Sequence, residues 1–345
     1  MTPDEADGED WYSVSTRAPN DAAIDAARTR AREAGRGRAA AQPSEIPVRG
    51  WLDILCRVFW ALPRDRVVST AGGVAFFTLL STFPGLATIV SFYGLFADPS
   101  VISRQLNMLS GVLPDGVLEL IADQLQRVAG QGTGLLSTAS LVSLAIAFWS
   151  ANSGVSALFD ALNVIYKERE KRSLVRFYAT TFLFTLSGTI IAVAAIGMVV
   201  GLPIVLNQVG LGARTDTLVR ILRWPALLIL VSLGLSLVYR YGPSRQEAKW
   251  RWVSWGSVVA ALCWVCASVL FSWYVASFDS YNRIYGSLGA GIGFMTWIWL
   301  SIVIVLLGAE LNAEMERQTA CDSTIGRPKP LGSRQAFAAD TVGPP

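Results

Sequence analysis

The chain has 345 residues, of which 52% are hydrophobic and only 16% are charged, and it contains no histidine. Soluble globular domains carry roughly 25% charged residues, so this composition argues against a soluble protein. Because histidine is absent, the sequence excludes His-ligated metal sites, Ser-His-Asp triads and histidine proton relays. We expect no metal site and no cofactor. Of the four cysteines, Cys263 and Cys266 form a CxxC within an apolar stretch, and we expect no disulfide framework.

Residues 1–45 are rich in Ala, Arg, Asp and Gly and contain almost no large apolar side chains. A segment of this kind buries too little surface to offset the entropy lost on ordering. We therefore expect a disordered cytosolic tail over residues 1–45, and a second over the proline-containing residues 317–345. The first ten residues hold five acids and no base, unlike a cleavable signal peptide. The first hydrophobic span is then expected to direct insertion.

The segment from residue 47 to residue 62 predicts an amphipathic helix. Apolar side chains recur there at helical spacing, opposite Asp53 and Arg57. The apolar positions are Trp51, Leu52, Leu55, Phe59 and Leu62. Such a helix either lies in the membrane interface or packs on the cytosolic face of its own protein, and the sequence favours neither reading.

Five stretches of 26 residues or more carry no charge, and a sixth, shorter one covers residues 224–239. A helix crosses the hydrocarbon core with about 20 apolar residues, and these runs are too long for barrel strands. The sequence therefore predicts an all-α, polytopic membrane domain over residues 46–316 with six transmembrane helices. Their expected bounds are residues 71–97, 135–160, 177–202, 218–241, 252–277 and 286–310.

Lysine and arginine are distributed unevenly between the segments that join these spans. The two tails and the second and fourth loops hold 23 of the 29 basic residues, and the other three loops hold 6. The positive-inside rule places the basic segments in the cytoplasm. We therefore expect a multi-pass protein of the bacterial inner membrane with both termini cytoplasmic. In the long external loop after the first span, apolar residues at helical spacing between residues 101 and 128 predict two amphipathic helices on the outer face.

Pro84 lies near the middle of the first predicted span, after Ser81 and Thr82. Proline removes a hydrogen bond from the helix and clashes with the carbonyl four residues earlier, here that of Leu80. We expect Ser81 or Thr82 to satisfy the freed carbonyl. A kink at this depth is either a moving part, as in the broken helices of transporters, or a static packing feature.

Polar side chains form one helical stripe on the second predicted span, running toward its cytoplasmic end. The stripe contains Trp149, Asn152, Ser153, Ser156, Asp160 and Asn163. Lipid does not tolerate such a face, so it points into protein or into a wet cavity. Interhelical hydrogen bonding explains the amides, whereas a polar path also explains the carboxylate of Asp160. Beside it, small residues around Gly154 favour close approach of another helix.

The last predicted span ends in two carboxylates, Glu310 and Glu314, one turn apart. Glu310 is expected at the same depth as Asp160, and Arg169, Lys171 and Arg176 are candidate partners of these two carboxylates. The carboxylates either form structural ion pairs or couple protons. A short outer turn precedes this span. Its candidate functional residues are Asp279, Asn282, Arg283 and Tyr285.

Several of these pieces together resemble the YihY/BrkB family of bacterial inner-membrane proteins. The matching stretches lie within residues 75–84, 148–166, 240–243, 282–289 and 308–314, and the resemblance covers about residues 50–316. It implies a six-span protein, and some members are thought to export envelope lipid or lipopolysaccharide. Members were once labelled ribonuclease BN. The absence of histidine and of a metal-ligand cluster argues against that activity here.

Together these features favour a transporter or a protein that translocates envelope lipid. The alternative is a non-transporting membrane scaffold or regulator of envelope assembly. We expect no catalytic residue and no nucleic-acid partner, because the chain lacks a catalytic cluster and a phosphate-binding loop. Membrane lipids are the expected partners, with envelope proteins as further candidates, and the sequence leaves the oligomeric state open.

Overall fold

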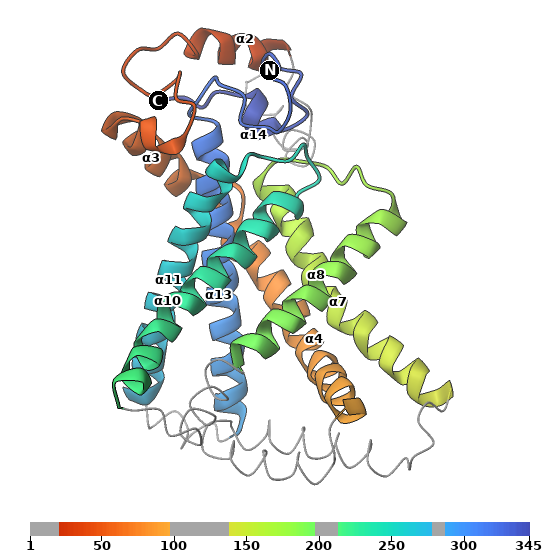
Figure 1. Ribbon diagram of the computed structural model, residues 1–345. Helices are drawn as coiled ribbons and strands as arrows, with labels where there is room; N and C mark the ends of the chain where they lie inside the picture. The colour runs from red at the N-terminus through yellow and green to blue at the C-terminus, as the bar shows by residue number, and fades with distance from the viewer. Residues whose placement is uncertain (1–20, 97–137, 197–212, 278–286) are drawn as a thin grey trace, which may run out of the picture.

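The structure, a computed structural model, describes residues 21–96, 138–196, 213–277 and 287–345 (Figure 1). These ranges are helical and contain no strand, and Ala248 and Thr324 form an isolated bridge. Six long helices make the body of the molecule. They are α4 (Val67–Phe96), α7 (Thr138–Ile165), α8 (Leu174–Ile196), α10 (Ala213–Tyr241), α11 (Trp250–Ser277) and α13 (Ser287–Glu316).

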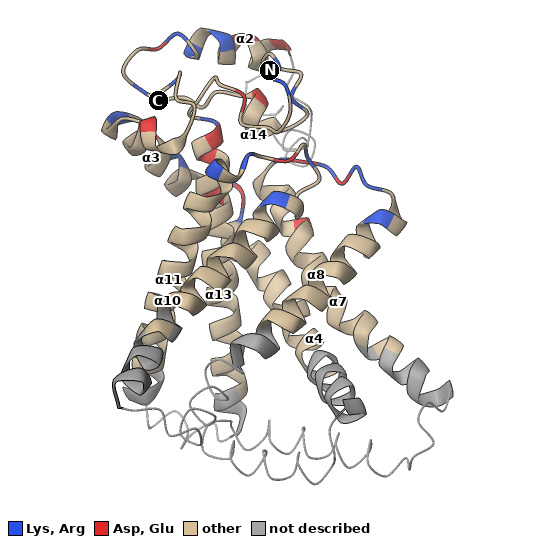
Figure 2. Ribbon diagram, in the orientation of Figure 1, with Lys and Arg blue, Asp and Glu red and all other residues tan. Residues whose placement is uncertain are grey.

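Shorter elements gather at one end of this body, which we call the polar end (Figure 1). They are α2 (Asp21–Arg30), the 3-10 turn η1 (Pro43–Glu45), α3 (Val48–Arg64) and α14 (Phe337–Asp340). The α7–α8 and α10–α11 connections lie at the same end. Figure 2 shows that the charged residues of the described chain concentrate there, while the shafts of the long helices are almost free of charge.

Three helices of the described chain have segments long and apolar enough to cross a membrane. These segments are Leu174–Ile191, Trp250–Tyr274 and Gly291–Glu316. Two shorter apolar stretches, Val67–Thr82 and Pro225–Tyr241, lie in α4 and α10. Large apolar side chains such as Ile190, Leu233 and Leu270 are exposed on the shafts. These features confirm a helical membrane protein. The external helices expected between residues 101 and 128 lie outside the described residues.

Glycines set two close helix crossings. A side chain at Gly154 of α7 would place its Cβ 3.2 Å from the Cα of Thr78 on α4, so only glycine fits without displacement of a neighbour. On the other side of the molecule, Gly256 of α11 faces Gly308 of α13. Asn312 bridges that crossing, accepting a hydrogen bond from the Gly256 N–H at 2.9 Å and donating one to the Val253 carbonyl.

The described core lies next to the polar end rather than in the middle of the shafts. Val67, Leu162, Ile165 and Leu306 are buried together there, with Tyr239 donating its hydroxyl to the Val305 carbonyl at 2.7 Å. Residues from α4, α7, α10 and α13 thus share one cluster. This shared core fixes how the helices present their polar ends to one another.

The two expected disordered tails differ from what the structure shows for residues 21–45 and 317–345. Ala338, Ala339 and Val342 are buried, and Arg38 donates hydrogen bonds to the carbonyls of Gln318 and Gly343. The tails contain few large apolar groups, so backbone carbonyls and charged side chains from the other tail supply the contacts instead. Residues 1–20 lie outside the described chain.

Candidate functional site

The polar stripe on α7 is divided among different surroundings. Asn152 is buried and joins α7 to α8: its amide donates to the Thr181 hydroxyl at 3.0 Å, and its carbonyl oxygen accepts from the Thr185 hydroxyl at 2.9 Å. The same amide also donates to Ser156 at 3.2 Å. Both ends of the Asn152 side chain are therefore satisfied by other residues within the bundle.

Other members of the stripe face different neighbours. Trp149 is exposed and stacks on Tyr178 of α8, with ring centroids 5.2 Å apart. Ser153 donates to the Ser150 carbonyl of its own helix at 2.7 Å. Asp160 is exposed. The stripe therefore does not form one continuous buried row in the described chain.

Asn163, the last residue of the stripe, is buried and connects two loops. Its side-chain oxygen accepts a hydrogen bond from the Ser244 N–H at 2.7 Å, and its amide donates to Glu170 at 3.1 Å. Arg172 then holds Glu170 with two hydrogen bonds of 2.7 Å and donates to the Gly242 carbonyl at 2.8 Å. The α7–α8 connection is thereby tied to the end of α10.

The hydrogen bonds near Pro84 differ from those expected. The hydroxyls of Ser81 and Thr82 both donate to the carbonyl of Thr78, at 2.9 and 2.8 Å, rather than to that of Leu80. Each hydroxyl reaches back three or four residues along its own helix, which is the short-range contact that serine and threonine make most easily. The helix α4 continues through Pro84.

The predicted carboxylates at the end of α13, Glu310 and Glu314, are both buried but differ in their partners. Glu314 forms an ion pair with Arg57 of α3, Nε to Oε2 at 2.6 Å, and a second ion pair with Arg317. Glu310 is also buried, and its Oε2 makes no hydrogen bond within the described chain. Within the described chain, neither Glu310 nor Asp160 forms an ion pair with the expected partners Arg169, Lys171 and Arg176, and Lys171 pairs with Glu168 instead.

A third carboxylate on α13, Glu316, was not singled out from the sequence. It forms a fully buried ion pair with Arg245, at 2.6 Å, and accepts a hydrogen bond from Ser323. The Arg245 guanidinium also stacks over the Tyr166 ring at 4.2 Å. Spacing alone gave no signal for this pair, because Glu316 lies after the apolar run and Arg245 lies 71 residues earlier.

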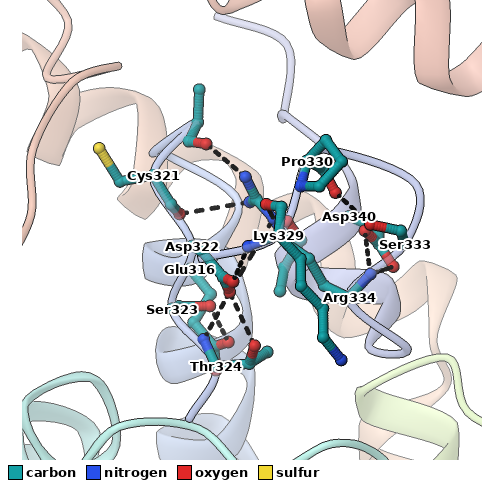
Figure 3. Close-up of polar contacts among 12 residues, drawn as sticks. Glu316, Cys321, Asp322, Ser323, Thr324, Lys329, Pro330, Ser333, Arg334 and Asp340 are labelled. Atoms are coloured by element: carbon teal, nitrogen blue, oxygen red, sulfur yellow. Dashed lines mark hydrogen bonds and ion pairs between the residues drawn. The ribbon is translucent and has the colours of Figure 1, made fainter. Parts of the chain in front are cut away.

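The chain after α13 folds around Arg334 (Figure 3). Its guanidinium donates to the carbonyls of Ala320 and Cys321, at 2.7 and 3.3 Å, and its backbone N–H donates to Asp340. Nearby, Asp322 accepts hydrogen bonds from the Thr324 backbone and side chain. These contacts carry the segment back to the α7–α8 connection, where the Phe337 N–H donates to Glu168 at 2.7 Å.

A partly open cavity of about 1040 Å³ lies between this returning segment and the loops that join α7 to α8 and α10 to α11. Three acids line it: Glu168, Glu247 and Asp340. Basic residues of the lining outnumber these acids. They are Lys167, Arg169, Lys171, Arg172, Arg176, Arg240 and Arg245. We call this the basic cavity.

Four of those cations have acidic partners. Lys171 pairs with Glu168 at 2.7 Å, and Arg240 pairs with Glu247 at 3.2 Å. Arg172 and Arg245 pair with Glu170 and Glu316, as described above. The remaining three, Lys167, Arg169 and Arg176, form no ion pair within the described chain, so the basic cavity carries a surplus of positive charge.

Two groups beside the cavity have shifted pKa values. Burial alone would raise the pKa of Glu170, but hydrogen bonds from the side chain and backbone of Arg172 and from Asn163 lower it to about 2. Burial lowers the pKa of Lys167, and the nearby charge of Arg317 lowers it further. The described residues contain no group of three or more Cys, Asp or Glu placed to hold a metal ion. The outer-turn candidates Asp279, Asn282, Arg283 and Tyr285 lie outside the described residues.

A family model described as virulence factor BrkB matches residues 58–330, about four fifths of the chain. The chain belongs to the virulence factor BrkB family. The match includes α4 to α13, the basic cavity loops and Glu310 and Glu314. It leaves out residues 21–57 and 331–345, which complete the polar end.

Individual relatives agree with this assignment. YfkH of Bacillus subtilis, whose name calls it ribonuclease-like, is 28% identical over 72% of this chain and 90% of its own length. A UPF0761 membrane protein of Vibrio atlanticus is 29% identical over 74% of this chain and 80% of its own. Another UPF0761 membrane protein, from Psychromonas ingrahamii, is 28% identical over 73% of this chain and 84% of its own length. No solved structure matches the chain.

Proposed function

We propose that this BrkB-family chain is a six-span protein of the bacterial inner membrane that transports a substrate or translocates an envelope lipid. The six long helices correspond to the six uncharged runs of the sequence. Their described shafts expose apolar side chains, and the charges gather at one end. The positive-inside rule assigns that end, and hence both termini, to the cytoplasm.

The observation that carries the transport proposal is the basic cavity at the polar end. A scaffold needs surfaces for partners, whereas a transporter needs a chamber that opens at one face of the membrane. A chamber lined by unpaired cations at the cytoplasmic face suits capture of an anionic substrate before it moves. The Pro84 segment of α4 is the proposed moving part, and the exposed Asp160 the proposed polar lining beyond the cavity.

The amphipathic helix α3 supports placement of the polar end at the membrane surface. Its buried face contains Asp53 and Arg57, which are held by Arg36 and Glu314. Leu52 and Phe59 are exposed to 61% and 66% on the opposite face. An apolar helix face turned away from the protein, with its polar face paired inward, is suited to the interface between headgroups and acyl chains.

The test is lipid translocation by purified protein in proteoliposomes, using fluorescent phospholipids and a membrane-impermeant quencher. The wild type is compared with Asp160→Asn, Pro84→Ala and an Arg169→Gln/Arg176→Gln double variant. Arg28→Gln/Arg327→Gln, which removes two exposed charges outside the cavity, is the matched control for the double variant. We expect protein-dependent flipping that the control retains and the cavity variant loses. Absence of flipping by folded wild-type protein would reject lipid translocation.

The exposed apolar face of α3 and the interlocked tails also favour a second candidate, a scaffold or regulator of envelope assembly. That function would depend on the outer surface of α3 and not on the cavity. A Leu52→Ser/Phe59→Ser double variant would then abolish envelope function in cells, while the cavity variant would leave it intact. The opposite pattern supports transport.

A further inference from the structure

The cations of the basic cavity exceed the charge that the protein itself neutralises. Lys167, Arg169 and Arg176 lack ion pairs within the described chain, while each lining acid already accepts a hydrogen bond or ion pair. Like charges gathered around a hollow raise one another's energy, and a bound anion relieves that repulsion. The arrangement therefore points to an anionic ligand.

Arg240 gives a second and independent indication. Its side chain is 8% exposed, and although one guanidinium nitrogen contacts Glu247, its Nε and Nη1 atoms make no hydrogen bond to any part of the chain that the structure describes. Buried guanidinium donors without acceptors are costly, because water no longer solvates them. Stacking on Trp250 at 4.5 Å fixes the plane of the group at the cavity wall.

From these two observations we infer that the basic cavity is a binding site for a phosphate-bearing group. Arginine donors arranged in a plane match the oxygens of phosphate in a bidentate manner, and arginine outnumbers lysine in this lining. The cavity volume of about 1040 Å³ far exceeds that of a lone phosphate and leaves room for an attached glycerol or sugar.

The setting of the cavity favours a ligand that reaches it from the membrane. Leu174 and Val175 at the start of α8 lie in the chain between the lining residues Ser173 and Arg176, and they are 77% and 81% exposed. Apolar side chains beside a basic lining suit a molecule with a phosphate head and an acyl tail. Basic pockets on the cytoplasmic side of membrane proteins bind such headgroups.

This inference concerns binding and goes beyond the proposed transport function. A cavity that holds a phosphate-bearing lipid is equally consistent with a lipid that is moved and a lipid that stabilises the polar end. Failure of flipping with retained binding would reject the transport proposal and leave the binding site standing. Failure of binding with retained flipping would reject the binding site and leave the transport proposal standing.

The experiment measures equilibrium binding to the full chain in neutral detergent by the shift in thermal unfolding midpoint. The probes are phosphatidylglycerol, phosphatidylcholine, glycerol 3-phosphate and inorganic phosphate. The cavity variants are Arg169→Gln/Arg176→Gln, which removes two exposed and unpaired charges, and Arg240→Gln. The control is Arg28→Gln/Arg327→Gln, which removes the same charge at exposed positions away from the cavity.

We expect phosphatidylglycerol to bind more tightly than phosphatidylcholine, with an affinity that falls as salt increases. Each cavity variant should weaken phosphatidylglycerol binding about tenfold, and the control should leave it unchanged. Saturable binding of glycerol 3-phosphate or inorganic phosphate at the same site would show that the phosphate is the recognised group. The ligand could then come from a soluble source. Equal binding of both lipids, or equal losses in control and cavity variants, would overturn the inference.

Discussion

At the residue scale, the same side-chain type serves different purposes along α7. The sequence predicts that Asn152 and Asn163 share a helical stripe with Asp160, which is exposed in the structure. The structure satisfies both amides through neighbouring elements, Thr181 and Thr185 for Asn152 and Ser244 and Glu170 for Asn163. Spacing within one helix reveals a face but not the partner across from it, so the sequence could not choose between hydrogen-bonding contacts and a polar path.

Glu170 makes the polar end sensitive to acid. Its pKa of about 2 lies below the ordinary value of 4.5, so its contribution to stability is present above about pH 4.5 and is lost as pH falls toward 2. We expect the unfolding midpoint of the purified protein to fall between about pH 5 and about pH 3, and Glu170→Gln to flatten that part of the profile.

Circular dichroism melts across this pH range measure the effect. Glu45→Gln is the control, since Glu45 lies outside the Asn163–Arg172 contacts and accepts a hydrogen bond from the Ala41 N–H instead. A Glu170→Gln profile that falls as steeply as the wild type would show that the carboxylate does not hold the α7–α8 connection.

At the element scale, helices in this chain approach one another through glycine and are anchored by charge. The sequence predicted a small-residue seam on α7, and Gly154 does contact α4 closely. It predicted the helix now seen as α3 and its two faces, but not that Asp53 and Arg57 would be the buried side. Those two residues become buried because Arg36 and Glu314, distant in the chain, neutralise them.

Gly154→Leu should separate α4 from α7. The new side chain would meet the Thr78 backbone and the Ser81 hydroxyl, which would lie 2.9 Å from its Cβ. We expect a loss of stability of about 1–3 kcal/mol. Gly234→Leu on α10 is the matched control, since nothing lies within 4 Å of a Cβ there. Equal melting temperatures for the two variants in detergent would contradict this packing.

Arg57→Met should release α3 from α13. The change leaves the buried carboxylate of Glu314 with Arg317 as its ion-pair partner within the described chain. Removing one member of a buried pair costs about 3 kcal/mol or more. Proteolysis of the region around α3 should become faster, and a second change, Glu314→Gln, should restore part of the resistance. If the double variant were cleaved even faster than Arg57→Met alone, the two side chains would not be energetically coupled.

At the scale of the whole molecule, uncharged runs and the distribution of basic residues were enough to predict a helical membrane protein. The sequence missed the packing of the tails because their contacts join residues such as Arg38 and Gly343, which lie 305 positions apart. It missed the basic cavity for the same reason: its lining comes from two loops and the returning segment, none of which is unusual alone. Only the fold brings these charges together.

The six-span topology is tested by cysteine labelling in a variant whose four natural cysteines are replaced by serine. A cysteine at Ser173, in the α7–α8 connection, should react with a membrane-impermeant maleimide only after the cells are opened. A cysteine at Ser280, in the predicted outer turn, should react in intact spheroplasts. Labelling of both positions in intact spheroplasts would contradict six spans with cytoplasmic termini.

The ion pair between Arg57 and Glu314 joins residues 257 positions apart, and Arg57 also donates to the Pro344 carbonyl, 287 positions later. Synthesis therefore presents the arginine long before either partner exists. Throughout the insertion of the intervening helices, α3 has no ionic anchor on α13. Closure of the polar end by this ion pair therefore has to wait until α13 has been made, and a chain stalled earlier leaves Arg57 without Glu314 and without the Pro344 carbonyl.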